Sequence, residues 1–170
     1  MRKSLEAIAL VALLLMGWVT YLAFEGPDRL PDRVPIHFDI AGNPNGWGSP
    51  AALLLLPVVA VGLYLAMTVV SGFPCAFNYP VRVTRENLPR LQSLTLNMIT
   101  WLKAELSCFF AILQWAIIRA VRSGQGHLFA LLVPALLVVV FSTIGWHFVA
   151  LFRAAKTGSG AMNGPSAPAN

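Results

Sequence analysis

Two residues in a polar stretch near the N-terminus, His37 and Asp39, could in principle bind a metal ion. They are two positions apart in an alternating segment, so both would project to one face of an extended strand. His127 lies in a second connection that we place on the same side of the protein. Zinc normally takes three or four ligands, and no HxxxH or CxxC cluster supplies the others. We therefore predict no metal site here.

A second set of polar residues repeats at helical spacing in a hydrophobic segment. At 100° per residue they fall within one narrow arc, and the arc comprises Thr100, Lys103, Ser107 and Gln114. Polar groups in lipid face other helices or a water-filled path. We favour hydrogen bonding between helices, and a substrate pathway is the alternative.

Glu105 points almost opposite to that arc, and His147 in the last hydrophobic segment is expected at a comparable depth. An ionisable pair at that depth could relay protons. The interpretation that we favour is that both residues reach the membrane interface or satisfy each other.

Catalytic templates are absent from the sequence. It contains no GxSxG, no HExxH, no glycine-rich phosphate loop and no carboxylate pair on one helix face. Cys75 and Cys108 lack a metal-ligand spacing and are expected to be free thiols. We expect a protein that is not an enzyme and needs no cofactor.

The composition places these residues in a membrane. The 170-residue chain is 57% hydrophobic and 11% charged, with a mean hydropathy of +0.69, and its apolar residues form long runs. We predict an all-α membrane domain over residues 1–156, in which four transmembrane helices form two hairpins, and a disordered tail over 157–170. The predicted helices cover residues 5–24, 51–71, 88–122 and 127–152.

The connection between the first two helices, residues 25–50, is expected to be an ordered outer loop. Apolar residues alternate with others from Val34 to Ile40, which predicts an extended segment with one apolar face. Asn43 to Gly46 is typical of a turn. Ser49 then suits the N-cap of the second helix, with Pro50 at its first position.

The basic residues predict the orientation of the chain. A formal charge of +5 and a pI near 9.8 could suggest nucleic acid, but the basic residues flank the hydrophobic runs. By the excess of Lys and Arg in short cytoplasmic loops, we expect both termini inside, in a bacterial cytoplasmic (inner) membrane. The cytoplasmic set is Arg2, Lys3, Arg82, Arg85, Arg90, Lys103, Arg153 and Lys156, against Arg29, Arg33, Arg119 and Arg122 outside.

The outer loop carries a motif with a family resemblance. It reads Leu30-Pro31-Asp32-Arg33-Val34-Pro35-Ile36-His37-Phe38-Asp39, then Gly42 and Asn45-Gly46-Trp47-Gly48-Ser49. Together with Asn78-Tyr79-Pro80 and Thr84-Arg85-Glu86-Asn87, it resembles bacterial domain of unknown function 1648 over residues 5–105. That domain is similar to the N-terminal part of SdpI-type immunity and signalling proteins, which protect cells from a secreted peptide toxin. Asn45 and Pro50 depart from the family, which commonly has an acidic residue and a lysine there.

The resemblance implies that the 30–47 loop is the functional part of the chain. We predict a non-enzymatic sensor or immunity-like protein that binds an extracytoplasmic ligand, peptide or membrane-protein partner. Alternatives are a small transporter using the polar arc, a structural partner of another membrane protein, and a loop that only caps the bundle with Trp47 at the lipid head groups. The predicted binding residues are Leu30, Pro31, Asp32, Pro35, His37, Asp39, Gly42, Asn45, Gly46 and Trp47.

Overall fold

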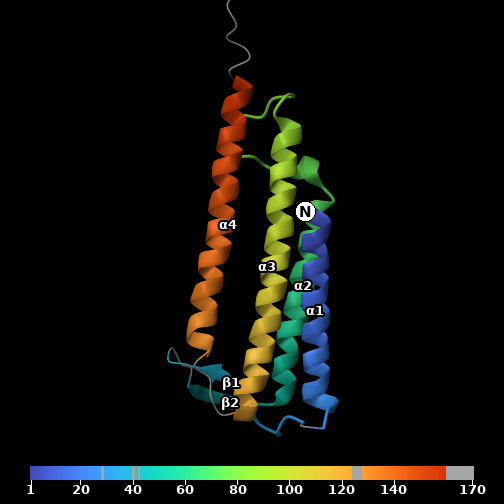
Figure 1. Ribbon diagram of the computed structural model, residues 1–170, viewed down its shortest axis with the longest axis vertical. Coiled ribbons are helices and arrows are strands. Elements are labelled where there is room, and N and C mark those ends of the chain that lie inside the picture. The colour runs from blue at the N-terminus through green and yellow to red at the C-terminus, as the bar shows by residue number, and fades with distance from the viewer. Residues whose placement is uncertain (28, 40, 42, 124–127, 160–170) are drawn as a thin grey trace, which may run out of the picture.

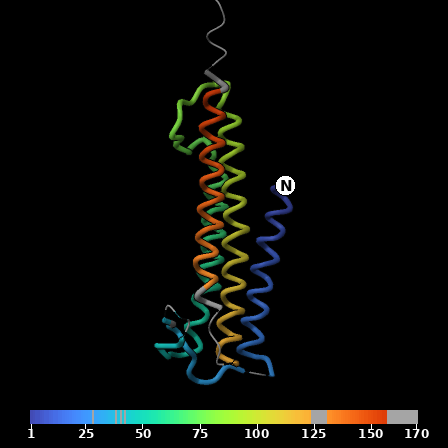
Figure 2. Tube along the Cα trace, turned by 60° about the vertical axis from the view of Figure 1, so that its left-hand side comes forward, coloured from blue at the N-terminus to red at the C-terminus, as the bar shows by residue number. Residues whose placement is uncertain are grey.

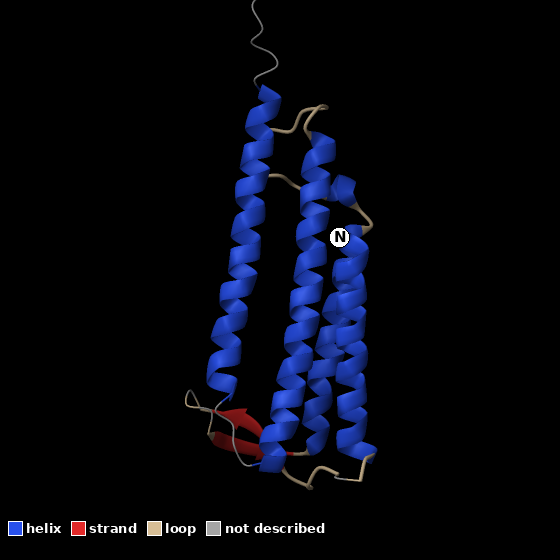
Figure 3. Ribbon diagram, viewed as in Figure 1, coloured by secondary structure: helices blue, strands red, loops and turns tan. Residues whose placement is uncertain are grey.

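The chain folds into a bundle of long helices with a small two-stranded sheet at one end (Figures 1 and 3). This computed structural model describes residues 1–27, 29–39, 41, 43–123 and 128–159. Four of its helices are long and apolar enough to cross a membrane, which confirms the predicted fold class. The elements are α1 (Arg2–Glu25), β1 (Val34–Phe38), β2 (Pro44–Gly48), η1 (Pro50–Leu54), α2 (Leu55–Ser71), η2 (Pro74–Ala76), α3 (Leu88–Ser123) and α4 (Leu128–Ser159).

Helix α3 is the centre of the bundle. It contacts α1, α2 and α4, and α4 packs along it. Figure 2 shows α4 lying beside α3 over most of their lengths, with α1 on the other side of α3. The end of α4 lies at one end of the bundle and the β1–β2 sheet at the other, and α1 starts part of the way along the bundle, on the side away from the sheet (Figure 1).

The helix starts follow the capping residues expected from the sequence. The Ser49 hydroxyl accepts a hydrogen bond from the Ala51 N–H at 3.3 Å, although the first turn is the 3₁₀ helix η1 rather than α-helix. Before α3, Thr84 and Asn87 exchange side-chain to backbone hydrogen bonds of 2.8 and 3.2 Å.

The predicted end of the fourth helix at residue 152 was wrong, because α4 continues to Ser159. The extra turns are held by packing: Leu151 and Ala154 are buried in a cluster with Leu91 near the start of α3. Tyr79 packs against the same cluster, and burial raises the pKa of its hydroxyl above the usual value. Of the predicted disordered tail, residues 160–170 lie outside the described residues.

The outer loop forms an antiparallel hairpin, β1–β2, which we call the lid. Val34 pairs with Gly48, Pro35 with Trp47 and His37 with Gly46. The register is irregular between Pro35 and His37 and between His37 and Phe38. The predicted turn at Asn43–Gly46 was wrong, because β2 begins at Pro44. The chain reverses between Asp39 and Asn43 instead, where the Asp39 N–H donates to the Asn43 carbonyl at 2.9 Å.

The predicted apolar face of β1 was also wrong. Val34 and Pro35 are both buried, whereas Ile36 is 48% exposed. A register irregularity between Pro35 and His37 breaks the alternation of faces. Among the strand's described side chains, the buried ones are therefore those of Val34 and Pro35 at its start.

Candidate functional site

The lid is anchored to the bundle by one fully buried side chain, Val34. It packs in a cluster with Ala23 of α1, Leu53 of η1 and Ile118 of α3. Leu30 packs against the same cluster, and its N–H donates to the Ala23 carbonyl at 3.0 Å. The hairpin therefore rests on three elements of the bundle.

The exposed part of the lid is stiffened by internal contacts. His37 Nδ1 lies 3.2 Å from the amide oxygen of Asn45 and hydrogen bonds to it across the two strands. A Cβ atom on Gly46 would lie 2.8 Å from His37 Cβ, so the close approach of the strands there requires glycine. Trp47 is 56% exposed beside this pair. His37, Asn45 and Trp47 are thus displayed on an ordered support.

Asp39 shapes the lid rather than standing free on its surface. One carboxylate oxygen accepts the N–H groups of Ala41 and Asn43 at 3.0 and 2.8 Å, and the other accepts the Asn43 side-chain amide at 3.2 Å. These bonds make Asp39 a turn-forming residue.

Of the other predicted loop residues, Pro31 and Asp32 are exposed and Pro35 is buried. Gly42 and His127 lie outside the described residues. Among the described residues, no group of three or more His, Cys, Asp and Glu side chains is placed to hold a metal ion.

The polar arc of α3 is buried and bonded to its neighbours. Lys103, only 3% exposed, forms an ion pair with Glu6 of α1 and donates to the Thr68 hydroxyl of α2 at 3.1 Å. Its ammonium lies 4.7 Å from the centre of the Tyr64 ring, and the Tyr64 hydroxyl donates to Glu6 at 2.9 Å. This lysine network joins α1, α2 and α3.

The sequence patterns described above did not point to Glu6, Tyr64 or Thr68. Glu6 carries a usable signal, because a carboxylate inside an apolar transmembrane run calls for a buried partner. Ser107 is also buried, and the buried Thr100 hydroxyl donates to the Leu96 carbonyl of its own helix at 2.8 Å.

Farther along the arc, Gln114 joins α3 to α1. Its side-chain N–H donates to the Thr20 hydroxyl at 2.9 Å, and Thr20 donates to the Met16 carbonyl at 2.8 Å. Gln114 is fully buried, yet its amide oxygen has no hydrogen-bond partner among the described residues.

We expect Gln114→Leu to lower the free energy of unfolding by no more than about 1 kcal/mol, because hydrogen bonds between membrane helices contribute about 0.6 kcal/mol on average. The substitution also removes an amide oxygen that lacks a partner among the described residues. Unfolding by SDS in mixed micelles measures the change. A loss above about 2 kcal/mol would show that the amide does more than join two helices.

Glu105 and His147 lie near each other across the α3–α4 contact, with Thr143 between them. The Thr143 hydroxyl donates a short hydrogen bond to one Glu105 carboxylate oxygen. His147 Nδ1 donates to the Thr143 carbonyl at 2.8 Å, and the imidazole is close enough to interact electrostatically with Glu105. Thr143 is a further residue that the sequence patterns did not indicate.

Comparison with known proteins supports the motif-based resemblance. Residues 8–61 match the family model described as Domain of unknown function (DUF1648), which covers most of α1, the lid, η1 and the first part of α2. An uncharacterized protein of Archaeoglobus fulgidus is 26% identical over 137 residues, which cover 72% of this chain and 73% of that protein. No solved structure matches the chain. The four long helices thus fit a multi-pass membrane protein, and residues 8–61 are similar to a domain of unknown function.

Proposed function

We propose that this protein is a non-enzymatic membrane sensor or immunity-like protein that binds an extracytoplasmic peptide or protein partner through the lid. The observation that carries the proposal is the contrast within one hairpin. Val34 is fully buried in the bundle, while Ile36 and Trp47 are 48% and 56% exposed on the same two strands. A loop that only capped the bundle would place Trp47 at the lipid head groups, and the crosslinking experiment below separates that role from binding.

Preorganisation supports binding by this surface. The His37–Asn45 hydrogen bond and the Asp39 turn fix the hairpin before a partner arrives, so less conformational entropy is lost on binding. Tryptophan is among the residues enriched at the energetic centres of protein interfaces. The combination favours a partner that covers Trp47 and hydrogen bonds to the His37–Asn45 pair.

The proposed orientation places the lid outside the cell and both termini in the cytoplasm of a bacterium. The distribution of Lys and Arg supports it, because the end of the bundle opposite the lid carries the larger basic set. A lid on that side meets secreted peptides and the outer parts of other membrane proteins.

The polar arc of α3 does not recommend transport as the function. Lys103 and Gln114 are each hydrogen bonded to a neighbouring helix. These hydrogen bonds support a role in joining the helices rather than in lining a substrate pathway.

Photo-crosslinking in intact cells tests the lid. A photoreactive amino acid in place of Trp47 should capture a specific peptide or protein, and His37→Ala should weaken the capture by about tenfold, because a hydrogen bond to the partner is then lost. Mass spectrometry of the adduct identifies the partner.

Trp18 provides a matched control for this experiment. It is 59% exposed, similar to Trp47, but it lies within the membrane-spanning α1. The same photoreactive residue at position 18 should capture lipid. Adducts with lipid alone from position 47 would reject the binding role and leave Trp47 as an interfacial anchor.

A further inference from the structure

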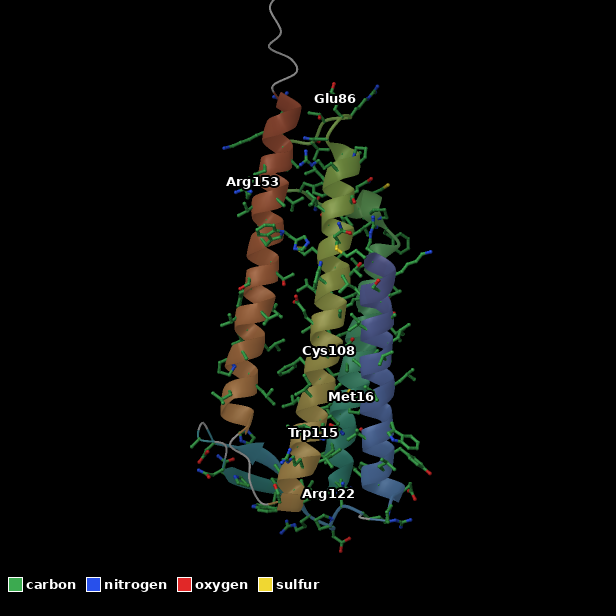
Figure 4. The ribbon with its side chains drawn as sticks, in the orientation of Figure 1. Met16, Glu86, Cys108, Trp115, Arg122 and Arg153 are labelled. Carbon is green, nitrogen blue, oxygen red and sulfur yellow. The ribbon has the colours of Figure 1, made fainter. Side chains whose placement is uncertain are left out.

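A groove of about 390 Å³ lies between α1, α3 and α4, on the side of α3 that faces α4. Helix α3 forms its floor, and Cys108 marks its level near the middle of that helix (Figure 4). Its walls are almost entirely apolar and include Leu5, Ile8, Phe109, Leu136 and Val139. Among the described residues that line it, Glu105 is the one with a carboxyl group.

One carboxylate oxygen of Glu105 is left without a hydrogen-bond partner among the described residues. Thr143 donates to Oε1, while Oε2 is buried and has no hydrogen-bond partner among the described residues. A buried acceptor without a donor is costly in an apolar environment. The groove therefore lacks a hydrogen-bond donor at this point.

A second hollow of about 570 Å³ continues toward the end of the bundle that carries the N-terminus. It is lined by Met1, Asn97, Trp146 and His147, shares Trp101 with the groove, and also includes Thr143, which bonds to Glu105. Glu105 thus lies where the more polar hollow meets the apolar groove.

The combined cavity is more polar at one end and apolar at the other. From Glu105 the apolar lining runs along α3 to Ile112, about 10 Å at 1.5 Å per residue, toward the lid end. In the other direction, away from the lid, lie the basic residues Arg2 and Lys3 at the start of α1. They are within about one helical turn of Leu5, which lines the groove. A head group at Glu105 would therefore lie near one membrane surface, with its tail directed toward the middle of the bilayer.

We propose that this groove binds a single-chain amphiphile with a primary ammonium head group. The ammonium donates to Glu105 Oε2 and lies near the Trp101 ring, whose face attracts cations. The alkyl chain follows the apolar walls toward Ile112 and Leu132. Charge complementarity selects an amine over an alcohol or a fatty acid, and the groove volume falls within the range of small-molecule sites.

Photolabelling of the protein in phosphatidylcholine vesicles tests the site, because that lipid head group has no N–H donor. The probes are dodecylamine and dodecanol, each with a diazirine in the chain, and mass spectrometry locates the adducts. We expect the amine to label peptides of α3 and α4 around Phe109 and Leu136. Glu105→Gln should reduce this labelling by at least about tenfold, because a charge-assisted hydrogen bond is worth such a factor.

Two further variants keep the test decisive. Glu25→Gln removes an exposed carboxylate outside the groove and should label as the unaltered protein does. Leu136→Trp adds bulk to the groove wall, keeps the Glu105 carboxyl group and should also reduce labelling, so the result does not depend on the folding of one variant. Equal labelling by amine and alcohol, or labelling unaffected by both Glu105→Gln and Leu136→Trp, would overturn the proposal.

Discussion

Glu6→Gln should lower the free energy of unfolding by on the order of 3 kcal/mol, because removing one partner of a buried ion pair leaves the other charge uncompensated. Lys103 is 3% exposed, and its remaining partners, Thr68 and the Tyr64 ring, are neutral. The Tyr64 hydroxyl also loses its charged acceptor. One substitution on α1 therefore weakens the contacts that join three helices.

The measurement is an SDS titration in mixed micelles, followed by circular dichroism. Glu6→Gln combined with Lys103→Met should restore most of the lost stability, because no buried charge is then left unpaired. Glu25→Gln is the matched control on the same helix: its ion pair with Arg29 is exposed and should contribute less than about 1 kcal/mol. Similar losses for Glu6→Gln and Glu25→Gln would contradict a structural role for the lysine network.

The helices could be predicted because the bilayer constrains them strongly. Each must satisfy its own backbone and cover the hydrocarbon thickness, so apolar run length alone locates it. The end of α4 escaped this reasoning, since the helix continues beyond Phe152, where Ala154 packs in a cluster with Leu91. That contact depends on how far α3 extends at the same end of the bundle.

The sequence could predict an ordered, extended outer loop, but it could not predict which residues of the two strands pair. Proline and asparagine at 43–45 are typical of turns, and the sequence does not reveal that Asp39 can satisfy the Ala41 and Asn43 N–H groups first. Once the chain reverses there, Pro44 falls in a strand. The prediction of one apolar face on β1 was wrong for a related reason, because the irregular pairing of the strands leaves Ile36 exposed.

Polar partners within the membrane were the least predictable part of the site. Helical spacing placed Lys103 and Gln114 on one face, but it could not identify Glu6 and Thr20 on α1 as their partners. Those pairs depend on the relative height of two helices, which no local pattern encodes. In the same way, Glu105 and His147 were placed at one depth, while Thr143 between them was not foreseen.

Val34→Asp should detach the lid from the bundle. Val34 is fully buried among Ala23, Leu53 and Ile118, and an unpaired carboxylate there would cost several kcal/mol, which corresponds to at least about a hundredfold shift toward the open state. Trypsin added on the lid side should then cleave at the neighbouring Arg33 at least about a hundredfold faster, because cleavage of an opened segment follows its population.

Ile36→Asp is the control for this prediction, because Ile36 lies on the same strand but is 48% exposed. A carboxylate there remains in water and should leave the cleavage rate near that of the unaltered protein. Hydrogen exchange of the β1 amides provides a second measure, since local opening would remove their protection. If the two aspartate variants are cleaved equally fast, Val34 does not anchor the lid to the bundle.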